Sequence, residues 1–172
     1  YVTAMVGGRE SGVAMAFNRA TRIQRQPGSV IKPIIAYAPA LELCGYTAAS
    51  MLLDEPTTFA DYAPSNFNDQ YYGWVTLREA VQRSLNVPAV KVLNEVGLGQ
   101  GKAFAESLGI VFDGAHTSLT LALGGFTYGV SPWQLAGAYA TFASGGIYNE
   151  PTVIRYITDA LGNVLYEYKQ DA

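Results

Sequence analysis

Two short apolar segments near the start of the chain, 1–6 and 13–17, lean toward β-structure, and the glycine-rich residues 7–12 lie between them. Glycines tolerate the positive φ angles of tight turns, so this pattern is typical of a β-hairpin. Residues 152–158 and 164–168 flank a polar turn in the same way. The pattern therefore predicts one hairpin near each end of the chain.

The segment 29–44 is largely apolar and is followed by Gly45, a residue type that commonly ends helices. It predicts a buried helix, with Pro33 tolerated in the first turn and a bend at Pro39. Residues 46–74 are instead rich in Pro, Asn, Asp, Tyr and Gly without a clear period. They predict a long loop region with room for short turns of helix, and loops of that length usually carry function.

Helical patterns dominate the second half of the chain. Thr76 and Glu79 have the spacing of a capping box and predict a helix that runs to Arg83. Further helices are predicted over residues 89–95, 102–108 and 132–144. The last of them carries several apolar and aromatic residues at helical spacing, which are predicted to be core rather than a cofactor site: Trp133, Leu135, Ala136, Tyr139, Ala140 and Phe142.

The composition narrows the class of protein. A length of 172 residues, 49% of them hydrophobic and 15% charged, predicts a single globular domain over 1–172. The net charge of -3 is scattered without a basic stripe, which disfavours nucleic-acid binding. The uncharged run 117–149 holds too many glycines and hydroxyl residues for a membrane span. The first residues lack the pattern of a signal peptide, so we expect the chain to begin inside a fold.

Cys44 and His116 are the single cysteine and the single histidine of the chain. They allow no internal disulfide and supply too few ligands for a zinc site, so we expect no metal and no cofactor. Cys44 is predicted to be a small buried residue rather than a nucleophile. His116 receives the same structural interpretation, because no acidic or nucleophilic motif lies beside it.

Ser29 and Lys32 are three residues apart at the predicted start of a helix, a spacing that puts both side chains on one face. The helix N-terminus favours negative charge, and apolar neighbours lower the pKa of a lysine by desolvation. These conditions suit a serine nucleophile beside a lysine base. Ser84 and Asn86 follow at a predicted helix end, offering a hydroxyl that can relay a proton and an amide that can hold a carbonyl. Ordinary helix capping explains that second pair equally well.

The motifs S-x-x-K and S-x-N together are typical of penicillin-binding proteins and of class A β-lactamases. The stretches FNRATRIQRQPGSVIKP, YYGWVTLREAVQRSLNVPAV and SLTLALGGFTYGVSPWQLAGAYATFASGGIYNEP resemble the transpeptidase domain of class A, bifunctional penicillin-binding proteins. The resemblance implies an α/β (α+β) transpeptidase fold, in which helices flank an antiparallel sheet that includes the first hairpin. It implies these roles: nucleophile and backbone oxyanion donor for Ser29, general base for Lys32, proton relay for Ser84 and substrate-holding amide for Asn86.

The third motif of that family, K-T-G, is missing from the chain. None of Lys32, Lys91, Lys102 and Lys169 is followed by Thr-Gly or Ser-Gly. Because both upstream motifs are intact, we interpret the chain as the N-terminal part of a transpeptidase domain. The substrate-carboxylate binder and the second oxyanion donor are then expected in a C-terminal remainder of the domain, without which residues 1–172 should be inactive.

The function implied by the resemblance is that of a peptidoglycan D,D-transpeptidase, which forms an acyl-enzyme with D-Ala-D-Ala stem peptides and binds β-lactams covalently. Its implied partners are stem peptides and lipid-linked glycan precursors, and its implied place is the outer face of the bacterial cell membrane, with the anchor outside this chain. The alternatives are a D,D-carboxypeptidase and a non-catalytic module that binds peptidoglycan or a divisome partner. A class A β-lactamase is disfavoured, because no glutamate lies between Ser107 and Glu150.

Overall fold

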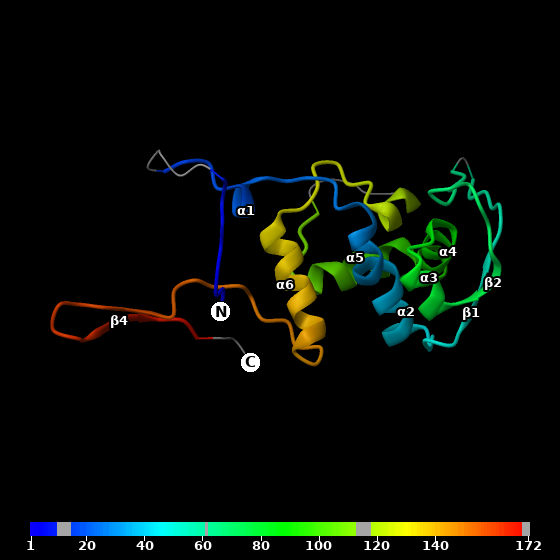
Figure 1. Ribbon diagram of the computed structural model, residues 1–172. Coiled ribbons are helices and arrows are strands. Elements are labelled where there is room, and N and C mark those ends of the chain that lie inside the picture. The colour runs from blue at the N-terminus through cyan, green and yellow to red at the C-terminus, as the bar shows by residue number, and fades with distance from the viewer. Residues whose placement is uncertain (10–14, 61, 113–117, 170–172) are drawn as a thin grey trace.

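The computed structural model describes residues 1–9, 15–60, 62–112 and 118–169. Helices form the body of the molecule, with a small sheet at one end and a hairpin that extends from the other (Figure 1). The elements in chain order are α1 (Arg19–Arg22), η1 (Gly28–Ile31), η2 (Pro33–Tyr37), α2 (Ala38–Leu43), β1 (Met51–Asp54), β2 (Gly73–Thr76), α3 (Leu77–Gln82), α4 (Asn86–Val96), α5 (Leu98–Ser107), η3 (Leu119–Leu123), α6 (Pro132–Ala143), β3 (Tyr156–Thr158) and β4 (Val164–Glu167).

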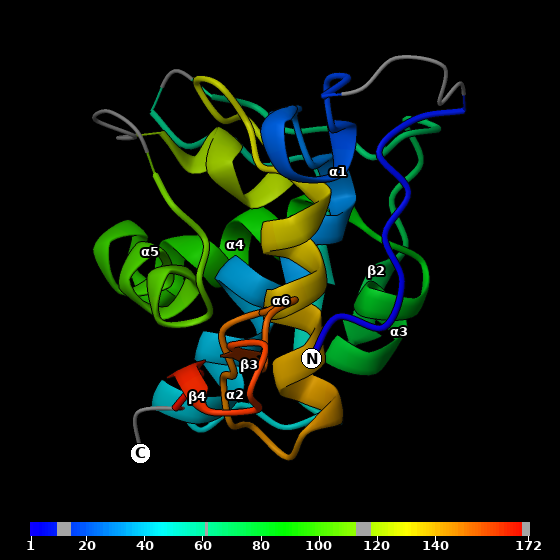
Figure 2. The same cartoon turned by 90° about the vertical axis from the view of Figure 1, so that its left-hand side faces the viewer.

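Helix α4 forms the centre of the core. Its residues Val87, Val90 and Leu93 are fully buried, and burial of such a side chain stabilises the fold by about 1.5 to 3 kcal/mol. The helix contacts η2, η3, α2, α5 and β1. In Figure 2, α4 lies behind α6, within the helical body. Elements from both halves of the chain are therefore held around α4.

The predicted helix over 29–44 is one continuous helical stretch that is built from three types of helix. It starts as the 3-10 turn η1, continues as the π-helical turn η2 and ends as α2. Pro39 has no N–H group to donate to a carbonyl one turn earlier, so the regular α-helical ladder is interrupted there. The N–H of Ala38 reaches back to the carbonyl of Pro33, so the stretch is π-helical just before Pro39, and the predicted bend stays a prediction. Gly45 follows α2 with φ +69, which confirms it as the helix-ending residue.

Strands β1 and β2 pair antiparallel, with Leu52 opposite Val75. Both of these side chains are buried, so the small sheet packs one face against the helices. The prediction of a loop region without strands over 46–74 is wrong for Met51–Asp54 and for residues 73–74, which form β1 and the start of β2. Four residues are too few to show a period of two, and the partner strand lies far along the chain.

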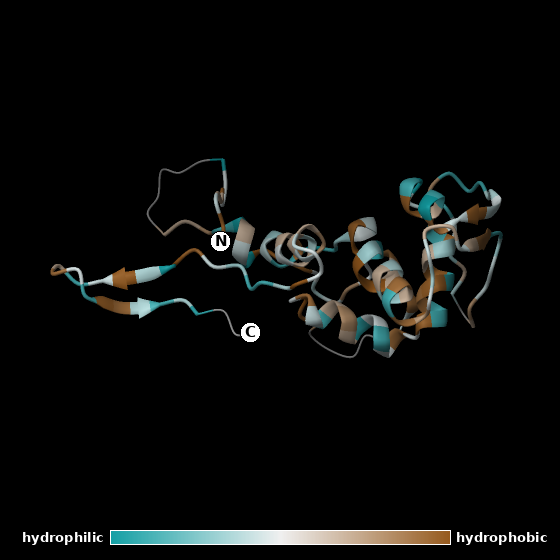
Figure 3. Ribbon diagram, turned by 90° about the horizontal axis from the view of Figure 1, so that it is seen from below, coloured by the Kyte–Doolittle hydropathy of each residue, from teal (hydrophilic) through white to brown (hydrophobic). Residues whose placement is uncertain are grey.

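The second predicted hairpin is confirmed as β3 and β4, which pair antiparallel with Tyr156 opposite Glu167. Both strands carry apolar residues, drawn in brown in Figure 3, and Ile157, Val164 and Leu165 are exposed. The hairpin belongs to a sheet separate from β1 and β2. Helices and small antiparallel sheets together agree with the predicted α/β class.

The first predicted hairpin is wrong over the residues that the structure describes there, 1–9 and 15–17, which form no strand. Residues 10–14 lie outside the described residues. The N–H of Val2 donates to the carbonyl of Thr152, and the carbonyl of Gly7 accepts from the N–H of Arg19. The segment thus finds its hydrogen bonds with distant parts of the chain, which a local pattern of apolar residues does not reveal.

Helix α6 is confirmed in place, because Ser131 and Gln134 form the complete capping box that opens it. The prediction that its large residues are core is wrong for Tyr139, which is 38% exposed, and for Phe142, which is 43% exposed, whereas Leu135 is partly buried against the core. Small residues face inward instead. A Cβ atom added at Gly137 would lie 2.8 Å from Cγ of Pro151, so the buried side of α6 has room only for small side chains.

Cys44 is exposed at the C-terminal end of α2, so the prediction of a buried residue is wrong. The helix end turns toward solvent there, which apolar composition alone does not show. His116 lies outside the described residues. Within the ranges that the structure describes, no helix is both long and apolar enough to cross a membrane.

Candidate active site

Ser29 lies on the 3-10 turn η1, directly after Gly28, whose φ is +59. Its side chain is exposed, and its carbonyl accepts a hydrogen bond from the backbone N–H of Lys32. The turn therefore presents the Ser29 hydroxyl to solvent, one helical turn before Lys32.

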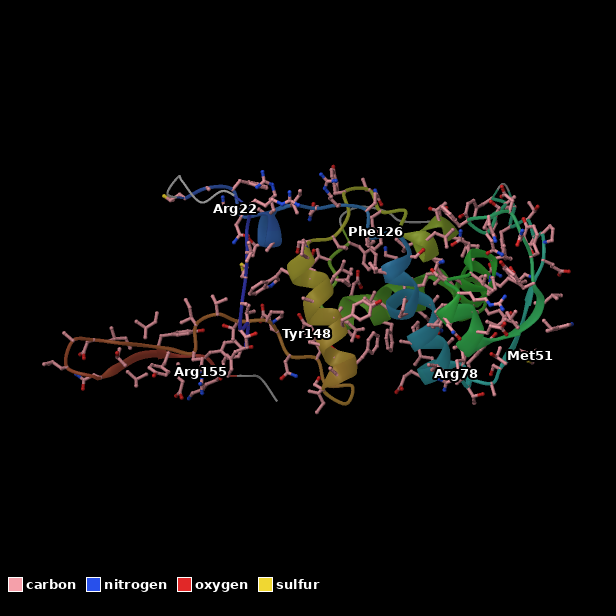
Figure 4. The ribbon with its side chains drawn as sticks, in the orientation of Figure 1. Arg22, Met51, Arg78, Phe126, Tyr148 and Arg155 are labelled. Atoms are coloured by element: carbon pink, nitrogen blue, oxygen red, sulfur yellow. The ribbon has the colours of Figure 1, made fainter. Side chains whose placement is uncertain are left out.

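Three contacts from later parts of the chain hold the turn that carries Ser29. The Gln26 side chain both donates to the carbonyl of Phe126 and accepts from its N–H at 2.7 Å (Phe126 is labelled in Figure 4). The Tyr139 hydroxyl donates to the carbonyl of Val30 at 2.7 Å. Gly124 has φ +88, and a Cβ atom there would lie 2.3 Å from the backbone nitrogen of Gly28. Such close backbone packing leaves the turn little freedom to move.

Lys32 is 2% exposed and lies at the junction of η1 and η2. Its Nζ donates to the carbonyl oxygen of Ser84 at 2.6 Å, to Oδ1 of Asn86 at 2.6 Å and to Oγ of Ser84 at 3.2 Å. Burial lowers the pKa of Lys32 from 10.5 to about 8. The amine is therefore closer to neutrality than that of a surface lysine, and it is held in a fixed place.

Ser84 follows α3 in the left-handed conformation, with φ 54. Its N–H donates to the carbonyl of Val81, and the N–H of Leu85 donates to the carbonyl of Ala80, the two bonds of a Schellman motif. Glycine usually takes the left-handed position of that motif, and another residue there costs about 1–2 kcal/mol. This turn directs both the carbonyl and the hydroxyl of Ser84 toward Lys32.

Asn86 is the first residue of α4. Its Oδ1 accepts from Lys32, and its Nδ2 donates to the carbonyl of Ser65 at 2.8 Å. The side chain is thus oriented at both ends, with its oxygen toward the amine. Ser84 lies at the predicted C-terminal end of α3, whereas Asn86 starts α4 instead of ending α3.

The structure therefore brings Lys32, Ser84 and Asn86 into direct hydrogen-bonded contact. Ser29 lies one helical turn before Lys32 on the same stretch, and the hydrogen bonds of Lys32 Nζ go to Ser84 and Asn86, so the place of Ser29 in the site stays a prediction. A groove opens on the Ser84 side of this cluster, lined by Asn66, Phe67, Asn68, Tyr72, Arg83, Ser84 and Leu85. In the described part of the chain, no group of three or more His, Cys, Asp or Glu residues could hold a metal ion.

Two buried polar residues beside the cluster carry no signal in the sequence that marks them as part of the site. Asp54, at the end of β1, is fully buried, and Asn66 is 3% exposed. Asn66 donates to both carboxylate oxygens of Asp54 and accepts from the N–H of Asn86. Both residues lie in the segment predicted to be a loop, where no local pattern marks them as buried.

Comparison with known proteins places the chain in a family. The penicillin binding protein transpeptidase domain matches residues 2–172. Penicillin-binding protein 1F of Bacillus subtilis (strain 168) is 42% identical over 170 residues, which cover 99% of this chain and 23% of that protein. Penicillin-binding protein 1A of Streptococcus pneumoniae (strain ATCC BAA-255 / R6) is 38% identical over 171 residues, 94% of this chain and 24% of that protein.

Solved structures with the same fold belong to the same group of proteins. The crystal structure of penicillin-binding protein 1A from Haemophilus influenzae matches with a TM-score of 0.79 and 35% identity, over 91% of this chain and 23% of that chain. Penicillin-binding protein PonA1 from Mycobacterium tuberculosis matches with a TM-score of 0.78 and 25% identity, over 94% of this chain and 44% of that chain. The chain thus spans about a quarter of the length of the curated relatives that it matches. Its fold is that of part of their transpeptidase domain, and the chain belongs to the penicillin-binding protein transpeptidase family.

Proposed function

We propose that the protein is a peptidoglycan D,D-transpeptidase in which Ser29 forms the acyl-enzyme. The hydroxyl of Ser29 attacks the carbonyl carbon of the penultimate D-alanine of a stem peptide, and the terminal D-alanine leaves with a proton on its nitrogen. An amine of a neighbouring stem then takes the acyl group. The observation that carries this proposal is the buried Lys32 amine, one helical turn after Ser29 and bonded to Ser84 and Asn86.

Lys32 acts as the general base for Ser29. With a pKa of about 8, roughly a tenth of the amine is neutral near pH 7, against less than about a thousandth for an unperturbed lysine. A neutral amine has a lone pair that accepts the proton of the Ser29 hydroxyl as the new bond forms. The exposed Ser29 is open to the substrate, while Lys32 stays shielded from water.

Ser84 and Asn86 serve the leaving group and the substrate. The Ser84 hydroxyl, 3.2 Å from Nζ of Lys32, passes the proton on to the departing nitrogen. The amide NH2 of Asn86 has two hydrogens, of which one goes to the carbonyl of Ser65 and the other holds a carbonyl of the stem peptide. The groove beside Ser84 gives the peptide a path to these groups. The backbone N–H of Ser29 stabilises the oxyanion.

Membership of the penicillin-binding protein transpeptidase family supports what we propose for the complete protein. The lining of the site is completed by a C-terminal remainder that carries the K-T-G motif, and the complete protein works on stem peptides and lipid-linked glycan precursors at the outer face of the cell membrane. β-Lactams acylate the same Ser29, because their strained carbonyl stands in for the scissile peptide bond.

A fluorescent penicillin tests this function on the complete protein that contains the chain. We expect covalent labelling that disappears in Ser29→Ala, and peptide mapping that places the adduct on Ser29. An adduct on Ser84 would overturn the assignment of the nucleophile. Absence of labelling in a folded protein would favour a non-catalytic binding module. Product analysis with a D-Ala-D-Ala peptide, with and without an acceptor amine, separates transpeptidase from D,D-carboxypeptidase.

A further inference from the structure

The Asp54 carboxylate is fully buried at the end of β1. In the described part of the chain the ion pairs are Arg83 with Glu79 and Lys91 with Glu55, so hydrogen bonds rather than a cation hold Asp54. Burying an unpaired carboxylate is costly unless such bonds compensate for the lost water. Its negative charge is one of the causes, after burial, that raise the pKa of the neighbouring Tyr37.

Most of that hydrogen bonding comes from Asn66. Its Nδ2 lies 3.0 and 2.9 Å from the two carboxylate oxygens of Asp54 and 2.8 Å from the carbonyl oxygen of Gln70. The N–H of Tyr72 adds a further bond to Asp54 at 3.0 Å. A carboxylate and a carbonyl can only accept, so the NH2 group of Asn66 must face them. The orientation of the Asn66 amide is therefore fixed by its hydrogen-bond partners.

The oxygen of Asn66 consequently faces the N-terminus of α4. Oδ1 accepts from the N–H of Asn86 at 2.8 Å and lies 3.5 Å from the N–H of Val87. The N-cap residue of α4, Leu85, has no side chain that could cap the helix. Asn66 supplies that cap from a distant segment and fixes the backbone of Asn86.

This series of contacts ends at Lys32, the proposed general base. Asn86 carries its Oδ1 to 2.6 Å from Nζ of Lys32. Asp54 orients Asn66, Asn66 fixes the start of α4, and the start of α4 sets where Asn86 meets the amine. Asn66 also lines the groove beside Ser84, but its polar atoms are bonded to Asp54 and to backbone groups. Neither Asp54 nor Asn66 is therefore placed to touch the reacting atoms.

We propose that Asp54 and Asn66 are a positioning pair, which holds Asn86 against Lys32 and thereby keeps the amine aligned with Ser29. This inference rests on the proposed function. It predicts that loss of Asn66 slows the chemical step rather than the binding of the β-lactam, because the groove can still admit the ligand while the base is displaced. A misplacement of about 1 Å can cost roughly 100-fold in rate.

The first test uses Asn66→Leu in the complete protein. Stopped-flow acylation by a penicillin should give a rate constant for acylation about 100-fold lower, with the dissociation constant of the non-covalent complex changed less than about threefold. Water entering beside Lys32 would also replace Asn86 as acceptor and relieve the desolvation of the amine. The acid limb of the pH profile should then move to higher pH.

Leu93→Ala is the matched control. Leu93 lies two turns further along α4, fully buried, and its substitution destabilises the same helix without removing the Asn66 cap. It should lower the melting temperature as Asn66→Leu does, yet leave the acylation rate constant and the pH profile unchanged. Equal effects of the two variants on acylation would overturn the positioning role.

A swap of the two side chains provides the rescue. Asn66→Asp alone sets two carboxylates face to face, whereas Asp54→Asn with Asn66→Asp restores a donor facing an acceptor, with the new carboxylate still capping α4. The new charge raises the pKa of Lys32, so rates are compared at the alkaline plateau of each profile. We expect the double variant to be at least about tenfold faster than Asn66→Asp, and no recovery would refute the pair.

A readout independent of acylation keeps the pair separate from the proposed function. The 13Cε signal of Lys32 in protein carrying labelled lysine, assigned by its loss in Lys32→Arg, should titrate at higher pH in Asn66→Leu and at its original pH in Leu93→Ala. If the unaltered protein fails to react with penicillin while this shift is seen, the proposed function fails and the pair stands. An unchanged titration of Lys32 in Asn66→Leu would overturn the positioning role of Asp54 and Asn66 without affecting the proposed function.

Discussion

The carbonyl oxygen of Ser84 lies 2.6 Å from Nζ of Lys32, closer than the hydroxyl oxygen of the same serine at 3.2 Å. The backbone of Ser84, as well as its side chain, therefore holds the amine. That geometry depends on the left-handed φ of 54, which costs a serine about 1–2 kcal/mol. Backbone strain at a residue that contacts the candidate base is typical of functional sites, where the surrounding structure holds the strained conformation.

Two substitutions of Ser84 separate its backbone strain from the role of its hydroxyl in acylation. Ser84→Gly removes the Cβ atom and the hydroxyl, whereas Ser84→Ala removes only the hydroxyl and keeps the strain. We expect the glycine variant to be more stable than the alanine variant by about 1 kcal/mol, and both to acylate slowly because neither can relay a proton. Thermal unfolding and penicillin acylation of the two proteins measure this. A more stable alanine variant would contradict the strain at Ser84.

The acylation rate should depend on the protonation of Lys32. Burial lowers its pKa to about 8, and the neutral amine is the base, so the rate should rise with pH, reach half its maximum near pH 8 and level off above it. In Lys32→Arg the guanidinium keeps its proton, so acylation should be more than about tenfold slower at every pH. Penicillin acylation measured across this range tests both. A midpoint near 10.5, or an unaltered rate in Lys32→Arg, would point to another base.

Features encoded within a few residues were predicted from the sequence. Thr76 caps α3 by accepting from the N–H of Glu79, one of the two bonds of the predicted capping box, because this bond joins residues only three positions apart. Ser29 and Lys32 share a helical stretch for the same reason, since their spacing fixes their relation. Membership of the transpeptidase family, inferred from the motifs, is confirmed by the comparisons.

Features that join distant segments could not be predicted in this way. The contact of Asn66 with Asp54 depends on how β1 packs beside the loop, and nothing local distinguishes Asn66 from the exposed Asn68. The exposed Tyr139 and Phe142 of α6 show the opposite error, because helical spacing marks an apolar face without saying what covers it. Burial is a property of the packed fold, and only the structure reveals it.

Asn86→Ala tests the role of the amide. The variant loses the NH2 group for the substrate and one acceptor for Lys32. We expect acylation by a penicillin with an amide side chain to fall by at least about tenfold, and acylation by 6-aminopenicillanic acid, which lacks that amide, to fall less. The ratio of the two second-order rate constants is the measurement. An unchanged ratio would leave Asn86 with only its contact to Lys32.

Residues 1–172 expressed alone should react poorly with penicillin. Helix α6 exposes Tyr139 and Phe142, and exposed apolar surface of this kind promotes association with other chains. The K-T-G motif is also absent from the segment. A gel with fluorescent penicillin and light scattering after size exclusion compare it with the complete protein. A monomer of 18.5 kDa that labels as fast as the complete protein would show that the third motif is dispensable.

Gly124→Ala should slow acylation without touching any predicted catalytic side chain. Gly124 has φ +88, and a Cβ atom there would lie 2.3 Å from the nitrogen and 2.6 Å from Cα of Gly28, so the added methyl group must push the turn that carries Ser29. Gly162 is the matched control, because its φ is +87 and nothing lies within 4 Å of the position of its Cβ.

Both alanine variants bear the left-handed backbone cost of about 1–2 kcal/mol, but only Gly124→Ala displaces Ser29 relative to Lys32. We expect the acylation rate constant to fall by about 100-fold in Gly124→Ala and to stay within about twofold in Gly162→Ala. Stopped-flow acylation and a melting curve for each protein separate loss of alignment from loss of fold. Equal acylation rates in the two variants would mean that the close packing of Gly124 on Gly28 does not set the position of the nucleophile.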